Sequence, residues 1–281
     1  MAYLLILLAH VIGDFTLQFN ELAKAKDKNI KYLLLHLIIY MLPITLVLVM
    51  YGNIIKVIIL FMTIMLSHFI VDYLKSKLSK KYYNPFAHNL FFILDRAIHI
   101  VILLILTYWV FKGNVVYNWF INKSLLSNIV NKEYFISIIL VTLICLSPTS
   151  IFIKHTLVYI DYETNKNKKA KLERLLSNTH EDDEINQIKR EINELDYQIV
   201  NWNNTDNSNR IGSIIGKLER MVILILTILN LYASVGLVFT AKSLARFKQL
   251  EDKDFAEKYL VGTLSSFLIT LILVYFTSFF K

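Results

Sequence analysis

The chain has 281 residues, of which 56% are hydrophobic and 19% are charged, and its mean hydropathy is +0.50. This composition excludes an ordinary soluble domain and is typical of a polytopic helical membrane protein. The net charge is +8, but the lysines gather in short loops between apolar segments. The charge therefore indicates contact with lipid headgroups and not with nucleic acid. The single cysteine, Cys145, lies in an apolar run and is expected to be a core residue.

Seven segments approach the length of about 20 mainly apolar residues that a membrane-spanning helix needs. They are residues 2–19, 32–52, 54–74, 89–111, 134–154, 219–241 and 259–280. The fifth contains Pro148 in the stretch "SPTS", which predicts a kink whose freed carbonyls bond to neighbouring hydroxyls. We therefore predict an all-α fold, a polytopic transmembrane bundle of about seven spans with a cytoplasmic helical hairpin.

The loop lysines predict how the chain lies in the plasma membrane. The first and third loops carry four lysines each, whereas the second has only Lys56, so the first and third loops are expected on the cytoplasmic side. With seven spans, the N-terminus would then lie outside and the C-terminus inside. Residues 241–258 conflict with this topology, because they would lie outside although they carry five basic side chains.

The same pattern divides the chain into four parts. Residues 1–112 form an N-terminal unit of four membrane helices, 113–154 an external loop with the fifth helix, 155–210 a polar cytoplasmic segment, and 211–281 the last two spans. Apolar residues in the polar segment follow a 3-4-3-4-3 spacing, the seam of a coiled coil, at Ile185, Ile188, Ile192, Leu195, Ile199 and Trp202. We expect residues 168–178 to be the antiparallel partner within the same chain, and a homodimer seam is the alternative.

Ionisable side chains interrupt the first four predicted spans. Three His/Asp pairs are spaced i, i+4, which puts both side chains of a pair on one helical face. Together with one further histidine, the set is His10, Asp14, His36, His68, Asp72, Asp95 and His99. Under the predicted topology all of them lie in the cytoplasmic half of the bilayer. Because ionisable groups in a bilayer are costly, we expect the four helices to gather them around one polar site.

Imidazole and carboxylate together are the common protein ligands of Zn²⁺, Mn²⁺ and Fe²⁺, so the set predicts a divalent metal site. The corresponding function is a metal-dependent intramembrane hydrolase that acts on a lipid, a lipid-linked phosphate or a membrane peptide. Asp14 or Asp72 would be its general base, and Arg220 would clamp an anion.

Other functions use the same residue types, and they stay open at this point. A transporter of divalent cations or protons would need the same cluster as a transit site. A structural network of His–Asp hydrogen bonds would need no ligand. A membrane sensor would signal through the predicted coiled coil. Whether the protein is an enzyme is therefore an open question.

The motifs "HVIGDFTLQ" at His10, "HFIVD" at His68 and "DRAIH" at Asp95 resemble an uncharacterised bacterial membrane-protein family, catalogued as domain of unknown function 3307. The resemblance covers about residues 1–110. The stretch that begins "IGKLERMVILIL" also resembles the ends of longer members. The resemblance implies a membrane helix bundle and brings no established activity.

Overall fold

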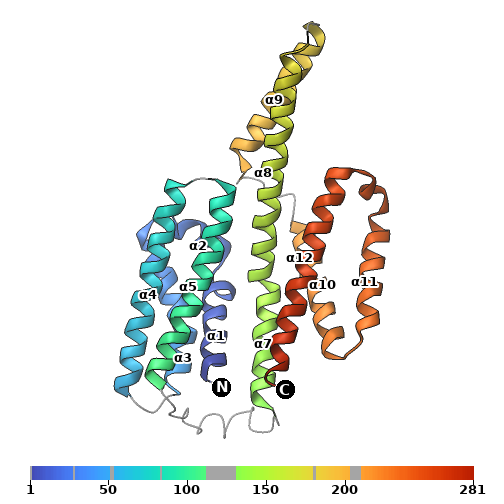
Figure 1. The fold of residues 1–281 in the computed structure, drawn as a ribbon. Coiled ribbons are helices and arrows are strands. Elements are labelled where there is room, and N and C mark those ends of the chain that lie inside the picture. Colours follow the sequence, from blue (N-terminus) through green and yellow to red (C-terminus); the bar gives the residue numbers. More distant parts are fainter. Residues whose placement is uncertain are drawn as a thin grey trace.

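The computed structural model describes residues 2–27, 29–50, 54–82, 84–111, 131–179, 182–202 and 210–281. All regular elements in these ranges are helices (Figure 1), as predicted. Five helical segments are long and apolar enough to cross a membrane: α3 (Ile30–Leu48), α4 (Ile54–Lys81), α5 (Pro85–Phe111), the α7–α8 pair (Lys132–Leu146 and Pro148–Leu176) and α12 (Lys253–Ser278). Large apolar side chains such as Leu46 and Ile55 are exposed on their outer faces, which indicates a lipid bilayer as their environment.

The first predicted span is shorter than expected. Helix α1 (Ala2–Val11) continues into a single π-helical turn, η1 (Ile12–Thr16), in which the Leu17 amide donates to the Ile12 carbonyl at 2.9 Å. The short helix α2 (Asn20–Lys26) follows. Helices α1, α3, α4 and α5 pack together as an N-terminal bundle. Its hydrophobic core consists of Ile6, Ala9, Tyr40, Met41, Ile44, Leu48, Leu60, Ile64 and Leu103.

The predicted interruption at Pro148 is present between α7 and α8. Pro148 has no amide hydrogen for the Ile144 carbonyl, and the Thr149 hydroxyl donates to that carbonyl at 2.9 Å instead. The Ser150 hydroxyl donates to the carbonyl of Leu146 at 2.9 Å. The hydroxyls of the "SPTS" stretch therefore satisfy carbonyls at the break, as the sequence predicted. Cys145 lies in the core beside it, fully buried.

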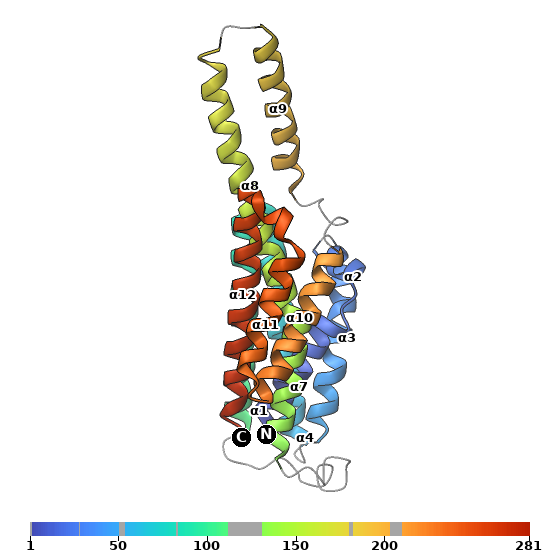
Figure 2. The ribbon, with the colours of Figure 1, turned by 90° about the vertical axis from the view of Figure 1, so that its right-hand side faces the viewer.

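Helix α8 runs on past the bundle and pairs there with α9 (Asp182–Val200), forming a long helical hairpin (Figures 1 and 2). Polar side chains link the two helices: Lys169 Nζ lies 2.5 Å from Asp196 Oδ1, and Asn165 Nδ2 donates to the Gln198 side chain at 3.1 Å. The partner of α9 is thus the preceding helix of the same chain. A coiled-coil supercoil and a homodimer stay predictions.

The predicted span over residues 219–241 is wrong. Two antiparallel helices, α10 (Arg210–Ile228) and α11 (Tyr232–Ala245), take its place. Asn230 has a φ of 60°, its amide bonds the Thr227 carbonyl at 3.1 Å, and the Leu231 amide bonds the Leu226 carbonyl at 2.8 Å. This is the Schellman pattern that ends a helix. A short 3-10 helix, η4 (Phe247–Glu251), then leads into α12.

Because α10 and α11 replace the single predicted span, the C-terminus lies at a different end of the bundle than the sequence predicted. Both termini lie at the end of the bundle away from the α8–α9 hairpin (Figures 1 and 2), whereas the sequence-based topology put them on opposite sides. The basic segment 241–258 returns toward the hairpin end of the bundle (Figure 1). Which membrane face each end meets stays a prediction of the lysine pattern.

Candidate metal centre

The structure gathers all seven predicted His and Asp residues in the N-terminal bundle. Each is at most 3% exposed. Helices α1, α3, α4 and α5 and the η1 turn contribute His10, Asp14, His36, His68, Asp72, Asp95 and His99, which we call the His/Asp cluster. The sequence therefore predicted correctly that these side chains lie close together. Their roles as metal ligands or catalytic groups stay proposals.

Donor atoms at the centre of the cluster have the spacing of metal ligands. His36 Nε2 lies 3.2 Å from His68 Nε2 and 3.4 Å from Asp72 Oδ2, and His68 Nε2 lies 3.6 Å from the same oxygen. Asp14 Oδ1 lies 3.5 Å from His36 Nε2. A tetrahedral ion with bonds of about 2.0–2.1 Å holds its ligand atoms about 3.3 Å apart. The three atoms of His36, His68 and Asp72 therefore have the spacing of ligands of one divalent ion, and Asp14 Oδ1 approaches one of them.

Hydrogen bonds alone do not satisfy these atoms. A neutral imidazole has one N–H, so His36 Nε2 donates to one of its three neighbours at most. Several buried atoms of the cluster also have no hydrogen-bond partner: His36 Nδ1, His68 Nδ1, His99 Nε2, and Oδ1 of Asp72 and of Asp95. Buried polar groups are normally paired, because an unpaired one costs free energy. His36 Nε2, which has three close neighbours and at most one N–H to share among them, thus fits a position beside a cation that accepts several lone pairs at once.

His68 also belongs to a second group, with Asp72 and His99, whose ligand atoms all lie within 4.8 Å of one another. His99 Nδ1 donates to the Asp95 carbonyl oxygen at 2.7 Å, so Nε2 is the ring nitrogen left with a free lone pair. His10 Nδ1 lies 3.2 Å from the Tyr40 hydroxyl. The Tyr40 ring stacks on His68 with a centroid distance of 3.7 Å. Such contacts fix the orientation of ligating imidazoles.

Three cations beside the carboxylates were missed by the sequence reasoning. Lys26 Nζ lies 3.0 Å from Asp72 Oδ2, and Lys75 Nζ lies 3.2 Å from Asp95 Oδ2. The Arg96 guanidinium pairs with Asp14 and, at 3.0 Å, with Asp95 Oδ2. Lys26 and Lys75 entered only the topology argument, as loop lysines. Arg96, next to Asp95 in "DRAIH", was the one visible signal in the sequence.

Gly13 allows the η1 turn to approach α3. A Cβ at this position would lie 2.8 Å from the Tyr40 carbonyl oxygen and 3.1 Å from the Tyr40 Cα. Only glycine leaves room for that contact. The next residue is Asp14, whose carboxylate faces His36 on α3. The π-helical turn, a feature frequent at functional sites, and Gly13 together bring the first carboxylate to the cluster.

Arg220 lies in a different part of the protein. Its Nε donates to the Cys145 carbonyl at 2.6 Å, and its terminal nitrogens donate to the hydroxyls of Ser266, at 3.2 Å, and Ser150. The guanidinium thus satisfies the remaining carbonyl at the α7–α8 break and ties α10 to α12. The structure does not bring Arg220 to the His/Asp cluster, and Arg96 is the arginine found there.

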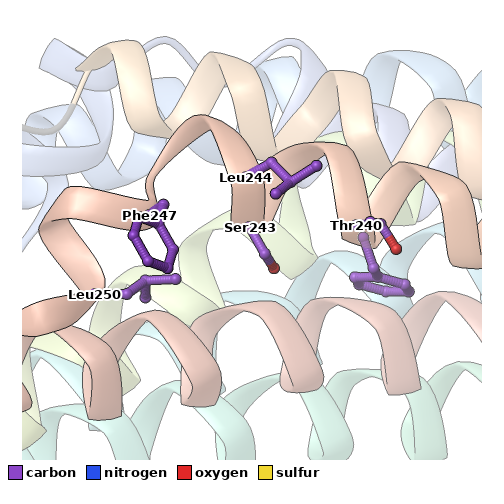
Figure 3. Close-up of a pocket in the computed structure, with 6 residues that line it drawn as sticks. Thr240, Ser243, Leu244, Phe247 and Leu250 are labelled. Atoms are coloured by element: carbon purple, nitrogen blue, oxygen red, sulfur yellow. The ribbon is translucent and has the colours of Figure 1, made fainter.

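A surface groove of about 350 Å³ lies on α11 and η4, away from the cluster (Figure 3). Its lining is mainly apolar and includes no His, Asp, Glu, Lys or Arg: Phe239, Thr240, Ser243, Leu244, Phe247 and Leu250. The groove shares no residue with the candidate metal centre.

The fold and the cluster define an all-helical membrane protein with buried His and Asp groups. Residues 2–127 match the model of a family described as "Protein of unknown function (DUF3307)", which confirms the resemblance seen in the motifs. The whole His/Asp cluster lies in the matched part, and Arg220 and the α8–α9 hairpin lie outside it. Neither a curated protein nor a solved structure matches the chain.

Proposed function

We propose that the protein is an integral membrane metalloprotein that binds a divalent transition-metal ion through His36, His68 and Asp72. Asp14 completes the set, and His99 is the alternative fourth ligand. The separations of 3.2–3.6 Å among the donor atoms of the first three residues carry the proposal. Two imidazole nitrogens and a carboxylate oxygen at this spacing favour Zn²⁺, with Mn²⁺ and Fe²⁺ as the other candidates.

The position of the cluster supports access from one end of the bundle. His36 is six residues from the start of α3 at Ile30, and Ile44 and Leu48, which are fully buried, follow further along the same helix. On α4, Leu60 and Ile64 precede the cluster and are equally buried. This aliphatic core closes the side away from the α8–α9 hairpin. A transit pathway would need polar groups there, so the arrangement favours a one-sided site over a transporter.

The proposed activity is hydrolysis of a lipid phosphate or lipid-linked phosphate. A divalent ion bound at this place would supply Lewis acidity for such a reaction. Arg96 and Lys75 add positive charge beside the donor set, which suits an anionic substrate better than a neutral peptide segment. Asp14 and Asp72 stay the candidate bases. The anion-binding role first predicted for Arg220 is assigned to Arg96 in this proposal.

Metal content of the purified protein tests the proposal first. We expect stoichiometric metal by elemental analysis in the native chain and its loss in a His36→Ala/His68→Ala variant of unchanged helix content. His88→Ala is the matched control, because His88 packs against His155 and Trp202 outside the cluster. If the native chain takes up no Zn²⁺, Mn²⁺ or Fe²⁺ on reconstitution, the cluster is a structural ion-pair network and the proposal is wrong.

An assay of metal-loaded protein in proteoliposomes then distinguishes a hydrolase from a transporter. Release of inorganic phosphate from a lipid phosphate, lost in the double variant, supports the hydrolase. Flux of the ion across the vesicle without phosphate release supports a transporter and overturns the hydrolase.

A further inference from the structure

Lys26 differs from the other two cations of the cluster in where it is attached. Lys75 and Arg96 belong to the long helices α4 and α5, whereas Lys26 is the last residue of α2, a helix of seven residues. Its side chain is nevertheless 95% buried, since only 5% of it is exposed, and Nζ lies 3.0 Å from Asp72 Oδ2. Lys26 therefore reaches into the cluster from a short surface element.

The oxygen that Lys26 contacts is the one that completes the proposed donor set. Asp72 Oδ2 also faces His36 Nε2 at 3.4 Å and His68 Nε2 at 3.6 Å. A divalent ion bound by these atoms would lie close to the Lys26 ammonium, and both carry positive charge. Repulsion between like charges is strong in a poorly solvated interior. The ion and the ammonium therefore compete for the same oxygen.

Charge balance points the same way. In the described part of the cluster, Lys26, Lys75 and Arg96 offset the charges of Asp14, Asp72 and Asp95 when the imidazoles are neutral. A divalent ion would leave this buried group strongly positive, and the withdrawal of one ammonium would reduce the excess. Lys75 is held by Asp95, which faces His99 at the edge of the donor set, and Arg96 pairs with Asp95 and with Asp14 and does not contact Asp72 in the interactions that the structure shows. Lys26 is the cation that a metal at Asp72 displaces most directly.

We propose that Lys26 is a displaceable internal cation that occupies Asp72 until a divalent metal ion replaces it. This inference rests on the proposed metal site and deepens it by naming a specificity determinant. A tethered ammonium is always present at high local concentration, so a monovalent ion such as Na⁺ does not displace it, whereas a divalent ion with imidazole ligands does. The site thus selects divalent transition metals over the abundant monovalent cations.

The side chain moves and helix α2 stays. The Ser76 hydroxyl on α4 donates to the Asp27 carbonyl at 2.9 Å, which fixes the end of α2 against the bundle. Gln18, with its amide turned to donate to the Asp14 carbonyl at 2.7 Å, accepts from Lys26 Nζ at 3.2 Å. Among the described residues, the Gln18 amide is the contact that Lys26 Nζ keeps when the contact with Asp72 is lost.

Amine labelling of the full-length native protein in detergent tests the displacement directly. The protein is treated briefly with an amine-reactive reagent, without metal and with Zn²⁺, and each lysine is quantified by mass spectrometry. We expect Lys26 to be protected without metal and labelled several-fold faster with Zn²⁺. Lys77, exposed on α4, is the internal control and should not change. Na⁺ at the same ionic strength should leave Lys26 protected.

A substitution provides the second measurement. Lys26→Met removes the competitor, so we expect tighter Zn²⁺ binding by calorimetry, with Lys77→Met unchanged. If Zn²⁺ binds to the native chain but Lys26 stays protected and Lys26→Met binds no more tightly, the displacement is wrong and the metal site stands. If neither the native chain nor Lys26→Met binds Zn²⁺, the metal site itself is wrong and this inference falls with it.

Discussion

Substitution of Gly13 by alanine tests whether the close contact between η1 and α3 builds the site. The added Cβ would lie 2.8 Å from the Tyr40 carbonyl oxygen, whereas ordinary contacts begin at 3.4 Å, so the two elements must separate by about 0.6 Å. The obstructing atoms are backbone atoms, which cannot rotate away. Overpacking of this kind costs about 1–3 kcal/mol. For a chain of this size each kcal/mol lowers the melting temperature by about 2–4 °C.

The same separation should weaken metal binding. Asp14 follows Gly13 directly, and its Oδ1 lies 3.5 Å from His36 Nε2 across the η1–α3 contact. We therefore expect Gly13→Ala to lower both the melting temperature in detergent, followed by tryptophan fluorescence, and the Zn²⁺ affinity, measured by calorimetry. Gly236→Ala is the matched control, because an added Cβ there meets no atom within 4 Å. In the interior of α11 it should stabilise the protein by about 0.5–1 kcal/mol.

The outcome that contradicts this reasoning is specific. If Gly13→Ala melts at the native temperature and binds Zn²⁺ with native affinity, the contact with Tyr40 does not set the position of Asp14. If Gly13→Ala and Gly236→Ala lower the melting temperature equally, the effect of Gly13 is a general property of glycine substitution in this protein and not of the cluster.

Three further changes test which regions of the protein support its stability and which support metal binding, by measurement of the melting temperature and the metal content. Arg96→Met leaves Asp14 and Asp95 without their shared partner and should destabilise the protein by about 3–5 kcal/mol. Lys168→Ala is the control, because Lys168 pairs with Asp254 in an exposed position, and it should have no measurable effect on stability. Equal losses of stability in the two variants would contradict the role of Arg96 as a buried ion-pair partner. Arg220→Met leaves the Cys145 carbonyl unpaired and should cost about 1–3 kcal/mol with unchanged metal content, and loss of metal would refute the separation of Arg220 from the cluster. Replacement of residues 173–191, the tip of the α8–α9 hairpin, with a Gly/Ser turn should leave metal content unchanged, and a fall in metal content would show that the hairpin supports the site.

Two patterns in the sequence led to the expectation that the His/Asp cluster converges, which the structure then confirmed. The i, i+4 spacing set the helical face of each pair, and the lysine-rich loops set the depth. His36 has no acidic residue at i+4, yet its depth placed it with the others, and its Nε2 lies at the centre of the donor set. Periodicity and depth define the face and the height of a residue on its own helix, whereas the structure shows which helices are neighbours.

The cations could not be predicted in the same way. Lys26 and Lys75 stand in polar stretches where lysine normally meets solvent and headgroups, but their long side chains extend back to buried carboxylates. Arg96 directly follows Asp95, and adjacent residues point to different sides of a helix. Its side chain nevertheless reaches both Asp14 and Asp95. Hydropathy describes the environment expected at the backbone of a residue, whereas the charged group of a long lysine or arginine side chain can lie several bonds away in a different environment.

The error at residues 219–241 has a different cause. The hydropathy there is continuous, and a single residue, Asn230 at φ 60°, ends one helix and allows the next to turn back. Asparagine is one of the few residues that adopt this conformation readily. The charge pattern had already pointed to the mistake, since residues 241–258 were too basic for the outer side. In the structure they return toward the hairpin end of the bundle (Figure 1) and not to the opposite end, where the seven-span topology placed them.

The composition of the cluster itself argues for a ligand. Ion pairs of Asp14, Asp72 and Asp95 with three cations already balance the buried charge, and buried ion pairs contribute little net stability. A purely structural network would gain nothing from imidazole nitrogens without partners, yet His36, His68 and His99 each keep one. Replacement of these rings by aliphatic side chains would then stabilise the fold. At the centre of the cluster, Nε2 of His36 and Nε2 of His68 lie 3.2 Å apart and both face Asp72 Oδ2, a spacing at which one divalent metal ion accepts the lone pairs of both rings.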